Sequence, residues 1–157
     1  MKGILIALGV CIVSAILEGV LAGRGVSARL KTLKMPSYSP PLAVWAVIGV
    51  AYYVICFTVL YRLLAIAPAG ALRAASIALL LIIMAINAFW NWVFFRKMNL
   101  WASWIAFFPY NVLAAALLLC VLPIDRISAF VFAPYLAYLL YANVWMYRLW
   151  RLNREMG

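Results

Sequence analysis

The sequence predicts an all-α integral membrane protein, a bundle of five transmembrane helices. Of its 157 residues, 71% are hydrophobic and 10% are charged, whereas a soluble domain has about half apolar and about a quarter charged residues. The charged residues fall in short clusters with long uncharged stretches between them. A chain this short and this apolar cannot bury its apolar surface in one water-soluble core. Lipid is therefore the expected solvent.

Five stretches are long enough to cross the hydrocarbon of a membrane. About 20 apolar residues suffice for a helix, because each residue rises about 1.5 Å. In lipid the backbone must satisfy its own hydrogen bonds, and the polar–apolar alternation of a barrel strand is absent, so these stretches are expected to be helices. We expect one domain over residues 1–157, with spans at about 3–23, 42–64, 74–95, 99–122 and 127–147.

Each span has its own justification. The first follows Lys2 as a signal peptide would, but it exceeds the usual signal length and no convincing small-x-small cleavage site follows. The second begins after Pro40 and Pro41, which suit a first helical turn because their missing N–H groups would be unpaired there anyway. The last three lie within the uncharged stretches 74–95, 98–124 and 127–147.

The basic residues predict the orientation. Four of them fall on one side of five spans: Lys2, Arg62, Arg73 and Arg126. Nine fall on the other: Arg24, Arg29, Lys31, Lys34, Arg96, Lys97, Arg148, Arg151 and Arg154. The positive-inside rule then places the N-terminus outside and the 24–41 loop and the C-terminus in the cytoplasm, most simply in a bacterial inner membrane. This asymmetry explains most of the net charge of +10, so we expect lipid and no nucleic acid as a partner; an anion site is the alternative.

The 24–41 loop and the second span carry the first candidate ligand-binding residues. Pro36 and Tyr38 precede the two prolines, and Trp45 and Tyr53 follow them. These residues could fold the loop over the helix ends as a stiff aromatic cap. An ordinary helix entry with an interfacial aromatic explains them equally well.

Polar amides mark the third span. Asn87 and Asn91 are four residues apart and share one helix face, with Trp90 between them. Amides at membrane depth turn inward, towards another helix, water or a ligand. Contact between helices is at least as good an explanation for either one taken singly.

An aromatic stripe marks the fifth span. Tyr135, Tyr138, Ala142 and Trp145 follow three-to-four spacing and so line one face. Tyrosine is costly in lipid unless its hydroxyl finds a partner. The stripe therefore predicts a pocket with a flat aromatic wall.

Glu18 is the one acid clearly inside a span. An ion pair with Arg24 or another loop cation explains it, and contact with a ligand is the alternative. The chain has no His, and its three cysteines lie in different spans without metal-binding spacing. No catalytic constellation is present, so we expect neither a metal, a required cofactor nor an enzyme.

The order of these features resembles the TspO/MBR family, also called tryptophan-rich sensory protein, translocator protein or peripheral-type benzodiazepine receptor. The resemblance covers nearly the whole chain and rests on Pro36, Pro40, Pro41, Tyr53, Asn87, Trp90, Phe94, Phe95, Pro134, Tyr135, Ala142, Trp150 and Asn153. It implies a five-helix bundle whose first loop covers a pocket, often in a homodimer, and a porphyrin (tetrapyrrole), sterol or synthetic aromatic ligand. The family's sterol pattern corresponds to Val144, Tyr147 and Arg151.

The chain departs from this family at several aromatic positions. Tyr38, Ala43, Gly49 and Tyr138 stand where tryptophan is usual, and Met146 stands where a buried asparagine is common. These departures indicate a divergent member with an altered pocket. A homodimer would use Ala74, Ala78 and Ala85, because small residues let helices approach closely.

The leading hypothesis is a membrane receptor or carrier for a flat hydrophobic ligand such as a tetrapyrrole or a sterol. The site residues would be Tyr38, Trp45, Tyr53, Asn87, Trp90, Asn91, Tyr135, Tyr138, Ala142 and Trp145. The alternatives are a small proton-coupled multidrug-type exporter using Glu18, a tetrapyrrole-degrading membrane enzyme, and a non-catalytic assembly subunit.

Overall fold

The computed structural model describes residues 1–154, which form helices and no strand. The elements are α1 (Lys2–Ala22), α2 (Val26–Lys31), α3 (Leu42–Ala65), α4 (Ala71–Asn91), the π-helix η1 (Trp92–Arg96), α5 (Leu100–Ile105), α6 (Phe107–Val121) and α7 (Arg126–Asn153). In this part of the chain five segments are long and apolar enough to cross a membrane: α1, α3, α4 with η1, α5 with α6, and α7. The predicted five-helix membrane bundle is confirmed.

Three spans differ in detail from their expected form. The third ends in the π-turn of η1, and the fourth is interrupted at Ala106. Pro109 explains the interruption, because it has no N–H to donate to the carbonyl of Ile105 four residues earlier. The fifth span continues beyond its expected end at 147 to Asn153. Pro134 lies inside α7 without ending it.

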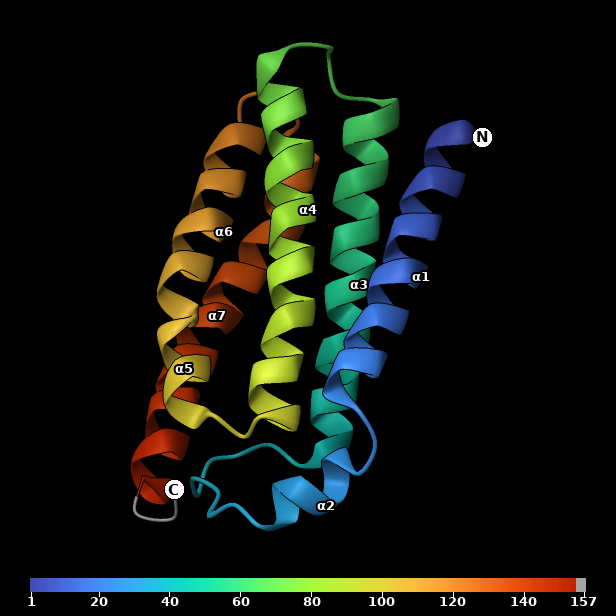
Figure 1. The fold of residues 1–157 in the computed structure, drawn as a ribbon. Coiled ribbons are helices and arrows are strands. Elements are labelled where there is room, and N and C mark those ends of the chain that lie inside the picture. The colour runs from blue at the N-terminus through green and yellow to red at the C-terminus, as the bar shows by residue number, and fades with distance from the viewer. Residues whose placement is uncertain (155–157) are drawn as a thin grey trace.

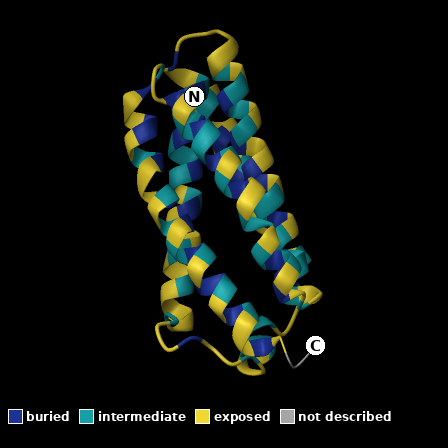
Figure 2. Ribbon diagram, turned by 90° about the vertical axis from the view of Figure 1, so that its left-hand side faces the viewer, coloured by how far each residue is buried: buried dark blue, intermediate teal, exposed yellow. Residues whose placement is uncertain are grey.

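The five spans lie side by side (Figure 1), and the contacts between them close a ring. α1 packs against α3 and α4, α3 packs against α7, and α6 joins α7 to α4. Fully buried side chains such as Cys56, Leu80, Leu117 and Leu139 lie between them. Exposed positions run along every span (Figure 2), and many of them are large apolar residues, as lipid contact requires.

The two ends of the bundle differ in charge. α2, the start of α5 and the end of α7 lie at one end, whereas the N-terminus and the α3–α4 connection lie at the other (Figure 1). The first end carries the larger group of cations. At the second end, Arg62 donates two hydrogen bonds to the carboxylate of Asp125, at 2.7 and 2.8 Å. This guanidinium lowers the pKa of Asp125 to about 2.

The chain leaves α1 through a turn that needs glycine. Gly23 and Gly25 have φ of +73° and +79°, a region that strains other residues. Shortly afterwards, Arg29 donates hydrogen bonds to the carbonyls of Ala22 at 3.0 Å and Phe95 at 2.8 Å. One side chain thus fastens α2 to the ends of α1 and η1.

Candidate ligand-binding pocket

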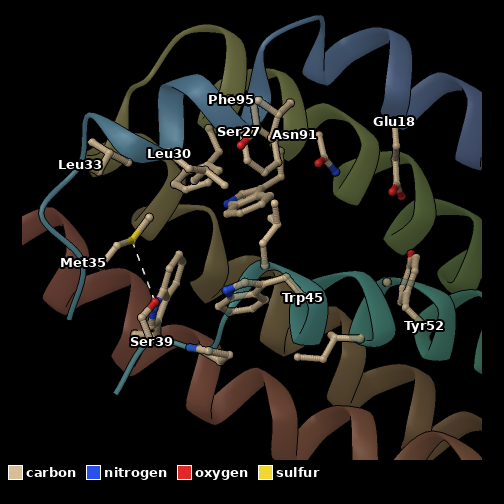
Figure 3. A pocket seen from close by; sticks show the side chains of 18 of the residues that line it. Glu18, Ser27, Leu30, Leu33, Met35, Ser39, Trp45, Tyr52, Asn91 and Phe95 are labelled. Carbon is tan, nitrogen blue, oxygen red and sulfur yellow. Dashed lines mark hydrogen bonds between the residues drawn. The ribbon is translucent and has the colours of Figure 1, made fainter. Parts of the chain in front are cut away.

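A cavity of about 700 Å³ opens between the helices at the cationic end of the bundle. Ligand pockets typically occupy about 300–1,000 Å³. Its lining comes from α1, α2, the segment after α2, α3, α4, η1 and α7. Most of the lining side chains are apolar or aromatic, and Figure 3 shows how several of them converge.

One wall is built by α4 and η1. The ring of Trp90 stacks on that of Phe94, with centroids 4.8 Å apart and planes 12° apart. The indole Nε1 of Trp90 donates to the backbone carbonyl of Ser103 at 2.9 Å. The π-turn places Phe94 and Phe95 on the same cavity. Stacking and this hydrogen bond hold the ring of Trp90 in one orientation in the cavity wall.

A second wall pairs α3 with α7 and meets the first where the rings of Phe94 and Trp145 lie 6.3 Å apart. The rings of Trp45 and Trp145 lie 4.8 Å apart, and the Nε1 of Trp145 donates to the Oγ of Ser39 at 2.8 Å. This hydrogen bond joins α7 to the segment that precedes α3. A second group on this wall is the stacked pair Tyr135 and Tyr138, with centroids 5.9 Å apart.

The inner end of the pocket is polar. Asn87 Nδ2 donates to Glu18 Oε1 at 2.6 Å, and Asn91 Nδ2 donates to the carbonyl of Asn87 at 2.9 Å. No ion pair in residues 1–154 includes Glu18. The expected pairing with Arg24 is therefore wrong, and Glu18 lines the pocket instead. Tyr52 completes this end; its side chain is buried and its hydroxyl has no hydrogen-bond partner within the described residues.

The roof of the pocket is the segment between α1 and α3. Val26, Leu30, Lys31, Met35 and Pro36 all line the cavity from this segment. Besides the Arg29 contacts, the buried amide of Asn153 fastens it from α7 by bonding the backbone of Lys34. The proline-rich loop therefore lies over the helix ends, and Tyr38 is not the residue that faces the cavity.

Seven of the ten predicted ligand-binding residues line this pocket: Trp45, Asn87, Trp90, Asn91, Tyr135, Tyr138 and Trp145. Three do not. Tyr38 is exposed and packs edge-on against Tyr141, Tyr53 is half-buried outside the cavity lining, and Ala142 is buried in the helix packing.

The sequence reasoning missed Tyr52 and Ser39. The helical spacing could have found the first, because Trp45, Gly49 and Tyr52 follow three-to-four steps along α3, whereas Tyr53 falls on a neighbouring face. No comparable signal existed for Ser39, since its role depends on the path of an irregular loop.

The residues of the sterol pattern lie outside the pocket. Val144 and Arg151 are exposed, and Tyr147 packs against Trp104 and Trp150 on the outer side of α7. The guanidinium of Arg151 lies 5.9 Å from the centroid of the Tyr147 ring. This arrangement suits a membrane interface. Among residues 1–154, no three His, Cys, Asp or Glu side chains are grouped as ligands for a metal ion.

The comparison with protein families decides the identity of the fold. The model of the TspO/MBR family matches residues 7–151, nearly the whole chain. The chain belongs to the TspO/MBR family. A search of curated proteins found no match. Membership supports a membrane receptor or transport-type role for this TspO/MBR protein.

Proposed function

We propose that this TspO/MBR protein is a receptor or carrier that binds a flat hydrophobic ligand, such as a porphyrin or a sterol, in the roofed pocket. One observation supports this most strongly: indole and phenol rings from α3, α4 and α7 surround one cavity of about 700 Å³. Flat rings held at fixed angles bind another flat ring by stacking, at little entropic cost.

The charges of the pocket suit a ligand with acid groups at one end. Lys31 lines the cavity on the roof segment and is exposed. Its ammonium group can meet a propionate-type carboxylate at the mouth, where both charges keep contact with water. The apolar body of the ligand would then lie between Trp90 and Trp145.

The roof segment would act as the lid of this site. It is held by side-chain hydrogen bonds from Arg29, Trp145 and Asn153, and Leu30 and Leu33 pack against the apolar cluster around Trp145. The hydrogen bonds are individually worth only about 0.5–1.5 kcal/mol. The segment can therefore open for entry of a ligand without unfolding the bundle.

A porphyrin titration tests the proposal. Protoporphyrin IX is added to the purified protein in detergent while tryptophan fluorescence is followed, because three tryptophans line the pocket. We expect saturable quenching, and at least about tenfold weaker binding for Tyr138→Ala or Asn87→Ala. Unchanged affinity in both variants would show that the ligand binds elsewhere.

Matched controls separate the pocket from the lipid-facing surface. Tyr147→Ala removes a tyrosine from the outer side of α7, and Trp101→Phe removes an exposed indole. Both should leave the affinity unchanged, whereas Trp45→Phe should lower the quenching amplitude. Equal effects of Tyr147→Ala and Tyr138→Ala would indicate unspecific partition into the micelle.

We also propose that the cationic end faces the cytoplasm of a bacterial inner membrane. The excess of cations at that end supports this orientation. The ligand would then enter from the cytoplasmic side. A reporter that is active only in the cytoplasm should be active when it is fused after α7. An inactive fusion would indicate the reverse orientation.

A further inference from the structure

The inner end of the pocket presents three oxygen atoms without a hydrogen-bond donor. They are Glu18 Oε2, Asn87 Oδ1 and the hydroxyl oxygen of Tyr52; the hydroxyl of Tyr53, which also has no partner within the described residues, lies close to the same carboxyl. Asn87 uses its amide N–H to bond the other carboxylate oxygen, so its carbonyl oxygen is left over. The carboxyl of Glu18 and the hydroxyl of Tyr52 point towards one another in Figure 3.

Burial makes the unpaired hydroxyl of Tyr52 costly, whereas Glu18 and Asn87 are half-buried. Tyr52 is only 6% exposed, and its hydroxyl is buried without a partner. A buried polar group without a hydrogen bond costs about 1–3 kcal/mol. The carboxyl of Glu18 is half-buried and no ion pair in residues 1–154 includes it, so a cation from a ligand would stabilise its charge. A buried polar group without a partner needs an explanation in a native structure, and a ligand that completes it is the explanation considered for Tyr52.

Among residues 1–154, Lys31 is the one cation that lines the cavity, and it lies on the roof. Lys31 belongs to α2, whereas Glu18 and Tyr52 lie at the end of the pocket farthest from the labelled loop residues (Figure 3). The pocket is therefore polarised, with a positive mouth and an acceptor-rich inner end. A ligand that carried only acid groups would satisfy the mouth and leave the inner end unpaired.

We propose that the inner end of the pocket binds the ammonium group of a flat, apolar amine. This inference rests on the proposed function, since it assumes a flat hydrophobic ligand in the same pocket, and it favours an amine over a porphyrin or a sterol as that ligand. An ammonium group has three N–H donors and no acceptor, which matches three acceptor oxygens. Glu18 supplies the opposite charge, and the ring of Tyr52 adds a face that attracts cations.

A neutral hydroxyl fits this end less well. It donates one hydrogen bond, so two of the three oxygens stay unpaired, and it leaves the charge of Glu18 uncompensated. The ammonium and the alcohol of one flat ring system therefore give a direct comparison.

Three pyrene probes in neutral maltoside micelles test the proposal. They are 1-pyrenemethylamine, 1-pyrenemethanol and 1-pyrenecarboxylate, which share one four-ring body. Energy transfer from the pocket tryptophans to pyrene reports binding. We expect the amine to bind at least about tenfold more tightly than the alcohol, as a charge-assisted contact in a dry site allows. In Glu18→Gln the ratio of the two affinities should fall towards one.

Two further variants separate charge effects. Lys31→Gln should weaken the carboxylate probe and keep the preference for the amine over the alcohol. Lys2→Gln removes a charge at the opposite end of the bundle and should change none of the ratios. If Glu18→Gln does not fold, the ratio in the wild-type protein remains decisive, because a ratio of one or below overturns the proposal.

The outcomes distinguish this inference from the function on which it rests. If all three probes bind, Trp45→Ala weakens them and the amine has no advantage, the ammonium site is wrong and the flat-ligand pocket stands. If none of the probes shows saturable transfer, both are wrong. If the Glu18→Gln variant still binds the amine more tightly than the alcohol, the preference does not come from the inner end and the ammonium site is wrong.

Discussion

The side chain of Asn153 pairs with the backbone of Lys34 in both directions. Its Oδ1 accepts from the N–H of Lys34 at 2.9 Å, and its Nδ2 donates to the carbonyl of Lys34 at 3.0 Å. The same Nδ2 donates to the carbonyl of Leu149 at 2.7 Å. The amide is only 5% exposed, so it fixes the roof segment to the last turn of α7 at one defined place.

Asn153→Leu should release the roof. It preserves side-chain size but leaves two backbone groups of Lys34 unpaired, at a cost of about 1–3 kcal/mol. We expect faster amide hydrogen exchange over 33–39 and faster ligand dissociation. Asn143→Leu is the control, since it removes a bond to Trp104 elsewhere on α7. Unchanged exchange over 33–39 in Asn153→Leu would contradict a fastening role.

The bond between Trp145 and Ser39 should be measurable as a coupling energy. Ser39→Ala leaves the indole N–H of Trp145 without its partner and should lower stability by about 1 kcal/mol. A double-mutant cycle with Trp145→Phe should then give a coupling of about 0.5–1.5 kcal/mol in thermal unfolding. Ser37→Ala, on the exposed side of the same loop, should be neutral. Additive effects in the cycle would show that the bond adds no stability.

The pair of Arg62 and Asp125 should make stability depend on pH. The pKa of Asp125 is lowered to about 2, whereas an unfolded chain has a value of about 3.9. The ion pair therefore contributes its full share of the free energy of unfolding above about pH 4. This share, about 1–2 kcal/mol, is lost as pH falls through about 2. Thermal unfolding from pH 5 to pH 2 checks this, and Asp125→Asn should flatten the curve. Arg73→Gln, a cation outside the pair, should leave its shape unchanged.

Two pocket tyrosines should respond in opposite ways to loss of the hydroxyl. The hydroxyls of Tyr110 and Tyr135 are hydrogen-bonded at 2.7 Å, so Tyr135→Phe should destabilise the protein by about 1–2 kcal/mol. Tyr52→Phe removes a buried hydroxyl that has no partner and should leave the ligand-free protein equally or more stable. Unfolding in detergent without ligand measures both. Destabilisation by Tyr52→Phe would contradict this prediction, because it would mean that the Tyr52 hydroxyl has a hydrogen-bond partner in the folded protein.

We propose a homodimer through the outer face of α4. Ala74, Ala78 and Ala85 are all exposed there, as a close helix contact between two copies requires. Ala78→Leu should shift the protein towards monomer by about tenfold in the dissociation constant, as measured by light scattering or cross-linking in bilayers. Val50→Leu, on the exposed surface of α3, is the matched control. An unchanged equilibrium in Ala78→Leu would exclude this face.

Hydropathy predicted the five spans because their length and apolarity are properties of local sequence. The same holds for the aromatic stripe of α7 and for Asn87 and Asn91, which helix periodicity places on one face. The partner of Glu18 was predicted wrongly, because charge proximity along the chain favoured Arg24 whereas the ring of helices brings Asn87 to it.

The irregular parts could not be predicted in the same way. The π-turn of η1 has no periodic signature, yet it sets where Phe94 and Phe95 point. The bond between Asn153 and Lys34 joins residues at opposite ends of the chain, so it depends on packing rather than on local pattern. Tyr38 is predicted as a ligand residue from its aromatic type, whereas the loop path turns the neighbouring Ser39 towards Trp145.

α7 is longer than the hydrocarbon layer of a membrane is thick. Its 28 residues extend about 42 Å, against a hydrocarbon thickness of about 30 Å, while the other four spans have 21–26 residues. Asp125 and Arg62 hold its first turn at one interface, so the surplus length projects beyond the other. The contact with Lys34 is therefore expected among head groups and water, and Tyr135 in the hydrocarbon layer. A hydrophobic ligand in the proposed site would reach from the membrane interface into the hydrocarbon layer while it stays inside the protein.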